Sequence, residues 1–217
     1  MVGSSMPTEF VDHLTATRLL AIIRGADAEA SVAAALALLD EGFQLLEISL
    51  NTANALEVIA RVVREGPEGA RIGAGTVLTI DDVKRVRDAG GSFAVTPAVA
   101  QSVAESARLG FPVVAGAPTP TECVSAMEQG AAAIKLFPAS IGGPPYLKAL
   151  RDPLPSIPFV AVGGVGVKEM VEYFEVGAIA AGLGSPLLGD AAAGGSLTAL
   201  RDRARRFHEA AAPWVEG

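Results

Sequence analysis

The chain has 217 residues, a net charge of −7, one cysteine and two histidines. The negative charge argues against nucleic acid or an anionic membrane surface as a partner. The single Cys123 excludes an intrachain disulfide and a cysteine-based zinc site.

Hydrophobic residues make up 50% of the chain and charged residues 19%, which excludes a disordered protein. The longest stretch without a charge, Ala89–Ala104, has 16 residues and is interrupted by Gly, Ser and Pro, so no transmembrane helix is expected. The first ten residues, MVGSSMPTEF, carry neither a basic nor an apolar leader segment. We therefore expect a cytoplasmic protein.

Eight short apolar runs alternate along the chain with longer amphipathic stretches. The runs are continuously apolar, which is typical of strands buried on both faces. They lie at Leu20–Arg24, Phe43–Ser49, Arg71–Gly75, Ser92–Thr96, Pro112–Ala115, Ala132–Leu136, Pro158–Val162 and Ala178–Leu183.

Six of the amphipathic stretches end at a glycine, which favours a helix that stops there. These predicted helices are Ala28–Glu41, Asn54–Glu65, Thr79–Ala89, Val99–Leu109, Thr121–Gln129 and Val167–Val176. Residues 1–15 are interpreted as an N-terminal extension or helix and residues 195–213 as a C-terminal helix, whose arginines alternate with acids as on a solvated face.

The alternation of eight strands with helices predicts an α/β fold, a (β/α)8 TIM barrel, as a single domain over residues 1–217. The alternative is an open doubly wound sheet, which usually carries a G-x-G-x-x-G turn after its first strand. Here that strand ends in Ile23-Arg24-Gly25 and no such turn follows.

Two charged residues lie inside apolar strands of the predicted barrel. Lys135 lies in AAAIKLF, whereas Lys84 and Lys168 lie beside acids on predicted helices. Burial favours the neutral amine, and a neutral amine is a nucleophile for carbonyl carbon. Glu47 lies in LLEISL and must be paired or protonated if buried. The two residues can form a structural salt bridge or a lysine nucleophile with its acid/base partner.

Other polar or small residues occupy the carboxyl ends of the strands, where barrel enzymes place their chemistry. Gly163-Gly164 and Gly184-Ser185 follow the seventh and eighth strands, the usual phosphate site, although tight turns also explain such glycines. Arg24 offers a fork for an anion, or a rim ion pair with Asp27.

The third strand, RIGAGT, places two glycines on its inward face and a hydroxyl at its end. Gly73 and Gly75 are expected to lower one wall of the cavity, and Thr76 to place its hydroxyl at the mouth. Cys123 lies on a predicted helix and is interpreted as a packing residue.

Taken together, these segments resemble the class I 2-keto-3-deoxy-6-phospho sugar-acid aldolases, the group that contains the gluconate and galactonate enzymes. The resemblance spans nearly the whole chain, in order and at matching spacing. It rests on AIIRG (Ala21–Gly25), LEISLNT (Leu46–Thr52), IGAGTVL (Ile72–Leu78), VTPAV (Val95–Val99), IKLFPAS (Ile134–Ser140), AVGGV (Ala161–Val165) and AGLGS (Ala181–Ser185).

The resemblance implies roles for individual residues. Lys135 forms the Schiff base, Glu47 is the general acid/base, and Arg24 and Thr76 bind substrate. The phosphate is surrounded by Gly163, Gly164, Gly184 and Ser185. The resemblance also implies a homotrimer that needs no metal or cofactor.

Two positions distinguish the subgroups of this family. The gluconate enzymes carry Arg where this chain has Asn51, and Thr where it has Val162; LNT and AVGGV resemble the galactonate subgroup. A Thr hydroxyl can bond the C4 hydroxyl of one epimer and Val cannot. Val162 therefore implies relaxed or galactonate-directed selectivity, while the missing Arg at Asn51 leaves Arg24 to carry more of the carboxylate binding.

The resulting hypothesis is a lyase that cleaves 2-dehydro-3-deoxy-6-phosphogalactonate to pyruvate and glyceraldehyde 3-phosphate. Within the class, the alternative substrate is the 6-phosphogluconate epimer. From other classes, the alternatives are a phosphate-binding barrel isomerase that uses Glu47 as its base, and a non-catalytic sugar-phosphate binder.

Overall fold

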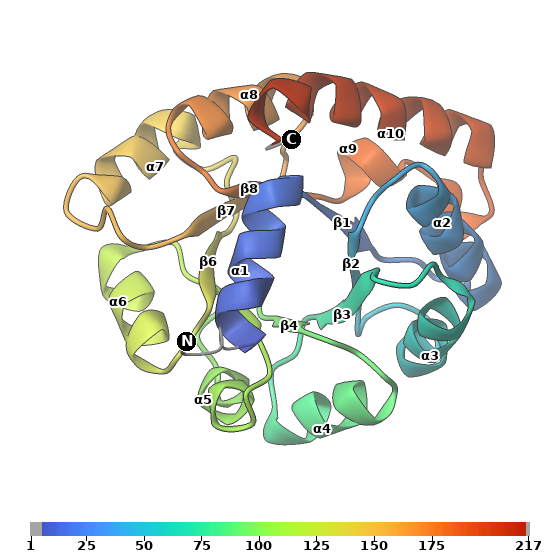
Figure 1. Cartoon of the computed structure of the whole chain (residues 1–217), viewed down its shortest axis with the longest axis horizontal. Coiled ribbons are helices and arrows are strands. Elements are labelled where there is room, and N and C mark those ends of the chain that lie inside the picture. The colour runs from blue at the N-terminus through green and yellow to red at the C-terminus, as the bar shows by residue number, and fades with distance from the viewer. Residues whose placement is uncertain (1–5, 216–217) are drawn as a thin grey trace.

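Eight parallel strands close into a barrel in the order β1 to β8, with β8 pairing back to β1, in a computed structural model that describes residues 6–215. The (β/α)8 prediction is confirmed. The helices form a ring around the strands (Figure 1). The strands are β1 Leu19–Ile23, β2 Leu45–Ser49, β3 Arg71–Gly75, β4 Ala94–Val95, β5 Val113–Gly116, β6 Ala133–Leu136, β7 Phe159–Val162 and β8 Ala180–Leu183.

The α-helices follow the predicted order, with two short 3-10 turns near the end of the chain. They are α1 Met6–Thr17, α2 Ala28–Asp40, α3 Ala55–Glu65, α4 Ile80–Asp88, α5 Gln101–Arg108, α6 Pro120–Glu128, α7 Gly143–Arg151, α8 Val167–Glu175, α9 Ser185–Leu188 and α10 Leu197–Ala211. Within residues 6–215, no helix combines the length and apolar character needed to cross a bilayer.

The predicted glycine stops are correct, and five of the six share one geometry. Gly42, Gly90, Gly110, Gly130 and Gly177 have φ between 65° and 94°, the left-handed region that closes a helix. The exception is Gly66, which ends α3 in an extended conformation with φ −76°.

One helix was not predicted. Helix α7 begins with Gly143-Pro144-Pro145, a sequence that resembles a loop. Proline is nevertheless compatible with the first turn of a helix, because the amide hydrogen it lacks has no intrahelical partner there. The two prolines are therefore a sign of a helix start that the sequence itself contains.

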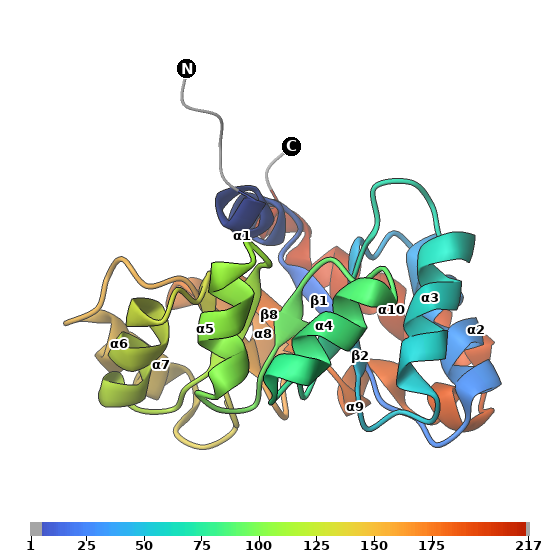
Figure 2. The same ribbon diagram turned by 90° about the horizontal axis from the view of Figure 1, so that it is seen from below.

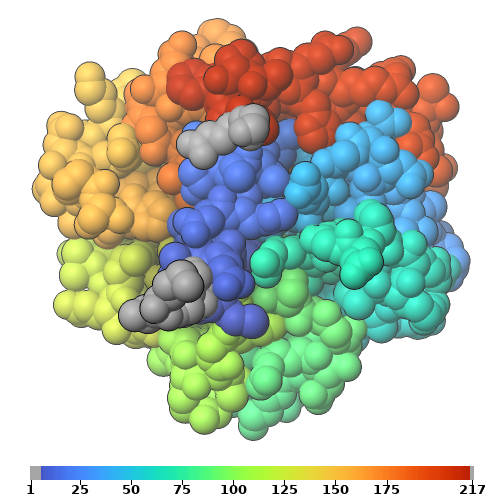
Figure 3. Space-filling view, viewed as in Figure 1, coloured from blue at the N-terminus to red at the C-terminus, as the bar shows by residue number. Residues whose placement is uncertain are grey.

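Helix α1 covers one end of the barrel. Its Phe10 and Leu14 are fully buried, and the Phe10 ring lies 5.0 Å from that of Phe93, inside the barrel. Figures 1 and 3 show α1 across the centre of this face, and Figure 2 shows α9 at the opposite end of the molecule. This end of the barrel is closed by apolar packing, so the open end is the one that carries α9.

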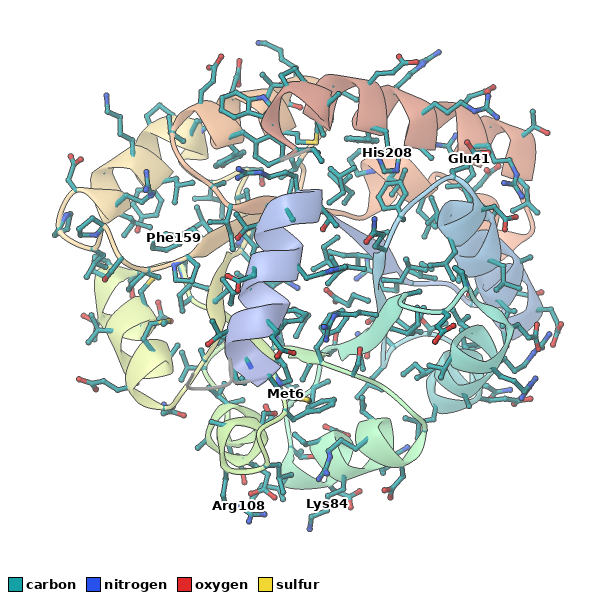
Figure 4. The ribbon with its side chains drawn as sticks, in the orientation of Figure 1. Met6, Glu41, Lys84, Arg108, Phe159 and His208 are labelled. Carbon is teal, nitrogen blue, oxygen red and sulfur yellow. The ribbon has the colours of Figure 1, made fainter. Side chains whose placement is uncertain are left out.

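Helix α10 packs along α2 and α9, and two of its arginines show how it is held there. Arg201 forms an ion pair with Glu41 at 3.2 Å, at the end of α2 that faces α10 (Figure 4). Arg203 donates to the carbonyl oxygens of Leu187 and Leu188 at 2.6 and 2.9 Å. The interpretation of this helix as a merely solvated face is therefore wrong for Arg203, which holds the end of α9.

Candidate active site

A pocket of about 560 Å³ opens at the carboxyl ends of the strands. All the residues predicted from sequence to form the site line this pocket: Arg24, Glu47, Thr76, Lys135, Val162, Gly163, Gly164, Gly184 and Ser185. The pocket is also lined by Ile22, Ser49, Asn51, Pro97, Phe137, Pro186, Leu188 and Gly189, so Asn51, the position that distinguishes the subgroups, lies in the site as well.

Lys135 and Glu47 face each other across the pocket. They lie on β6 and β2, which are opposite strands of the closed barrel. The Nζ of Lys135 is 3.9 Å from Oε1 of Glu47, and the two residues are only 6% and 2% exposed. The Nζ also lies 5.0 Å from the centre of the Phe137 ring. The predicted pairing is confirmed, and it places an amine and a carboxyl side by side with little exposure of either to solvent.

The carboxyl of Glu47 is suited to exchanging protons. Burial raises its pKa above the ordinary value, and the nearby Lys135 opposes that effect. Its Oε2 is buried without a hydrogen-bond partner in the described chain. A carboxyl whose protonated form is favoured by burial, and which keeps one oxygen unused, can act as a general acid and base.

The two glycines of β3 make room for side chains rather than for ligand. A Cβ added to Gly75 would lie 1.7 Å from Oε1 of Glu47, and one added to Gly73 would lie 2.6 Å from the Phe93 ring. The expectation that both glycines lower a wall of the cavity is therefore wrong. Gly75 is the space in which the Glu47 side chain lies.

Two hydroxyls meet at the ends of β2 and β3. The Oγ of Ser49 lies 3.1 Å from Oγ1 of Thr76, and the backbone N–H of Asn51 donates to the Ser49 Oγ at 3.4 Å. Thr76 has a φ of 61°, which is unusual for a β-branched residue. The sequence placed Ser49 at the end of a strand but did not single it out, because its partner comes from the neighbouring strand.

Arg24 lines the pocket and is exposed. The proposed alternative, an ion pair with Asp27, is not found, because Asp27 instead caps α2 by accepting the N–H of Ala30 at 2.9 Å. In residues 6–215 the Arg24 guanidinium makes no ion pair with an acid, so its charge is available to an anion.

The glycines after β7 and β8 bring bare backbone to the pocket. Gly163 and Gly164 have φ values of 101° and 74°, and a Cβ on Gly184 would meet nothing within 4 Å. Helix α9 begins at Ser185, and Pro186 occupies its second position. On this side of the pocket, the residues Gly163, Gly164, Gly184 and Ser185 offer backbone groups and one hydroxyl and include no carboxylate.

Cys123 lies outside this pocket. It is fully buried on α6, and burial raises the pKa of its thiol to about 11. A thiol that resists ionisation and is out of reach of solvent is a packing residue, as predicted.

Comparison with known proteins gives consistent matches. The family model "KDPG and KHG aldolase" matches residues 11–195. Two curated relatives are each 40% identical over 171 residues, covering 78% of this chain: the "Probable 2-dehydro-3-deoxy-6-phosphogalactonate aldolase" of Rhizobium meliloti (81% of its length) and the "2-dehydro-3-deoxy-6-phosphogalactonate aldolase" of Escherichia coli K12 (83%).

Solved structures match in the same way. One described as "Native KDPGal structure" has a TM-score of 0.84 at 36% identity, covering 91% of this chain and 95% of that one. A KDPG aldolase from Legionella pneumophila, "with pyruvate captured at low pH as a covalent carbinolamine intermediate", has a TM-score of 0.81 at 25% identity, covering 93% and 97% of the two chains.

Proposed function

The chain belongs to the KDPG and KHG aldolase family, and on that premise we propose that it cleaves 2-dehydro-3-deoxy-6-phosphogalactonate to pyruvate and glyceraldehyde 3-phosphate through a Schiff base on Lys135. The observation that carries this proposal is the buried amine and carboxyl 3.9 Å apart at the base of the pocket.

In the proposed mechanism, the neutral amine of Lys135 attacks the C2 carbonyl carbon and forms a carbinolamine. Glu47 donates a proton to the departing hydroxyl, and loss of water leaves an iminium. The carboxylate then takes the proton of the C4 hydroxyl, the C3–C4 bond breaks, and its electron pair flows to the iminium nitrogen as an enamine forms. Protonation at C3 and hydrolysis of the imine release pyruvate and restore the amine.

The remaining residues hold the two anionic ends of the substrate. Backbone N–H groups at Gly163, Gly164 and Gly184, with the Ser185 hydroxyl, receive the phosphate at the start of α9. Arg24 and Thr76 bind the carboxylate end. Because the protein carries a net charge of −7, Arg24 and these N–H groups supply the local positive potential that a multiply charged anion needs.

Val162 bears on the choice between C4 epimers. It is 4% exposed and lines the pocket, so it offers the C4 hydroxyl an apolar contact without a hydrogen bond. The galactonate epimer is proposed as the substrate, and steady-state rates on both epimers measure the preference. Val162→Thr introduces a hydroxyl and should shift the ratio of the kcat/KM values for the two epimers about tenfold toward the gluconate epimer. An unchanged ratio contradicts this role.

Trapping tests the Schiff base directly. Treating the protein with pyruvate and borohydride should add one reduced pyruvate to Lys135, seen by mass spectrometry of the digested chain. The Lys135→Met variant should show no adduct and no cleavage, whereas the Lys84→Met variant, which changes an exposed residue of α4, should match the unaltered protein. A barrel isomerase or a sugar-phosphate binder would give no adduct.

We propose further that the protein is a cytoplasmic homotrimer. Light scattering should then find a particle of three 22.1-kDa chains. A monomer or dimer at micromolar concentration contradicts the trimer.

A further inference from the structure

The hydroxyl pair of Ser49 and Thr76 has one favoured direction of hydrogen bonding. Both residues line the pocket, and their oxygens are 3.1 Å apart. The N–H of Asn51 already occupies one lone pair of the Ser49 Oγ. Within residues 6–215, the Thr76 Oγ1 is the only side-chain or backbone oxygen bonded to the Ser49 hydroxyl.

The positions of the two protons follow from that arrangement. If Ser49 accepted from Thr76 as well, its own hydroxyl proton, in a residue only 4% exposed, would have no protein acceptor. If Ser49 instead donates to Thr76, its proton is satisfied and the Thr76 proton points into the pocket. The chain of bonds then runs from the Asn51 N–H to Ser49, and from Ser49 to Thr76.

The backbone at Thr76 supports a ligand-directed hydroxyl. Among the described residues, three that are not glycine have a positive φ: Arg18, Asn54 and Thr76. Thr76 is the one with a branched Cβ, for which this conformation is disfavoured. Strained residues of this kind persist where the surrounding structure holds them, often at ligand sites.

Resting on the proposed function, we propose that Ser49 is a positioning residue that makes the Thr76 hydroxyl a hydrogen-bond donor to the substrate carboxylate. An ionised carboxylate accepts hydrogen bonds only, so a fixed donor is complementary to it. In a 2-keto acid this group adjoins the carbon that Lys135 attacks. Ser49 therefore affects affinity for the carboxylate without touching the reacting atoms.

The test uses lactate, which carries the carboxylate of pyruvate but has a hydroxyl in place of the ketone with which an amine forms a Schiff base. NMR titration of the full chain gives its dissociation constant. Ser49→Ala should raise that constant about fivefold, the usual effect of losing one hydrogen bond. Thr76→Val should raise it at least as much, and adding Ser49→Ala to Thr76→Val should cost nothing more, because Ser49 acts through Thr76. Thr76→Ala replaces Thr76→Val in the same comparison if the valine variant does not fold.

Ser106→Ala is the matched control. Ser106 is a fully buried serine on α5, outside the pocket, and its Oγ lacks a partner in the described chain. Its loss should leave lactate binding unchanged. In steady-state cleavage, Ser49→Ala should raise KM about fivefold and leave kcat within about twofold.

Two results overturn the proposal. One is unchanged lactate binding in Ser49→Ala. The other is a Ser49→Ala effect that persists in the Thr76→Val background, which would mean that Ser49 contacts the ligand itself. Because lactate needs no Schiff base, these results are independent of pyruvate trapping. Absence of the borohydride adduct would refute the proposed aldolase chemistry and leave the role of Ser49 to be decided by lactate.

Discussion

Replacing Gly75 by alanine should disable the site by moving a carboxyl. The new Cβ would lie 1.7 Å from Oε1 of Glu47, whereas ordinary contact begins at 3.4 Å, so the oxygen has to move by about 1.7 Å. A displacement of about 1 Å at a reacting group can cost about 100-fold in rate. We therefore expect kcat to fall about 100-fold or more in Gly75→Ala. The assay couples glyceraldehyde 3-phosphate release to a dehydrogenase.

Gly73→Ala is the control on the same strand. Gly73 pairs with Glu47 in the strand register, but the three atoms nearest to its added Cβ, at 2.6 Å, all belong to the Phe93 ring rather than to the carboxyl. Overpacking there should destabilise the protein by about 1–3 kcal/mol, which lowers Tm by several degrees at this length. The folded protein should keep kcat within about threefold of its original value. A Gly75→Ala protein with a kcat within threefold of the original would show that Glu47 does not need this position.

Three other changes test the charges around the barrel. The folded-state pKa of Glu47 is raised, so its contribution to stability is present below the unfolded pKa and is lost as pH rises through the folded pKa. The Tm of Glu47→Gln minus that of the original protein should therefore increase from pH 4.5 upward. A Tm difference that does not change with pH contradicts the raised pKa. The pKa of His208 is lowered, chiefly by burial, so the contribution of this residue to folding stability is lost as pH falls below about 6.5. Between pH 6.5 and 5, the Tm of His208→Phe, which keeps an aromatic contact with Phe43, should therefore fall by less than the Tm of the original protein. Arg203→Met removes the guanidinium that holds the end of α9, so it should raise KM for the phosphorylated substrate about tenfold and leave pyruvate trapping unchanged. If substrate binding and pyruvate trapping were weakened equally, Arg203 would support the whole pocket rather than α9.

The fold could be predicted from local signals, and the family from the resemblance of seven short segments to known aldolases. Continuous apolar runs, glycines after amphipathic stretches and a threonine cap before α4 are readable over a few residues, and each was placed within about two residues of the observed element. Charged residues in apolar strands were also readable, because Lys135 and Glu47 oppose the pattern around them. The pattern does not predict α7, since its opening Gly-Pro-Pro occurs both in turns and at helix starts.

The amino-acid sequence by itself determined the barrel, its helix stops and the two ionisable groups inside it, because these depend on hydrophobic period and on residue type. Only the tertiary structure decided what each group meets. The register in which β2 pairs with β3 puts Glu47 into the space left by Gly75 and joins Ser49 to Thr76, and closure of the barrel brings Lys135 opposite Glu47. Packing of α10 against α9 brings Arg203 to the carbonyl of Leu188, which lies 15 positions earlier in the chain. Such contacts depend on strand register and on the packing of distant elements, which no local pattern encodes.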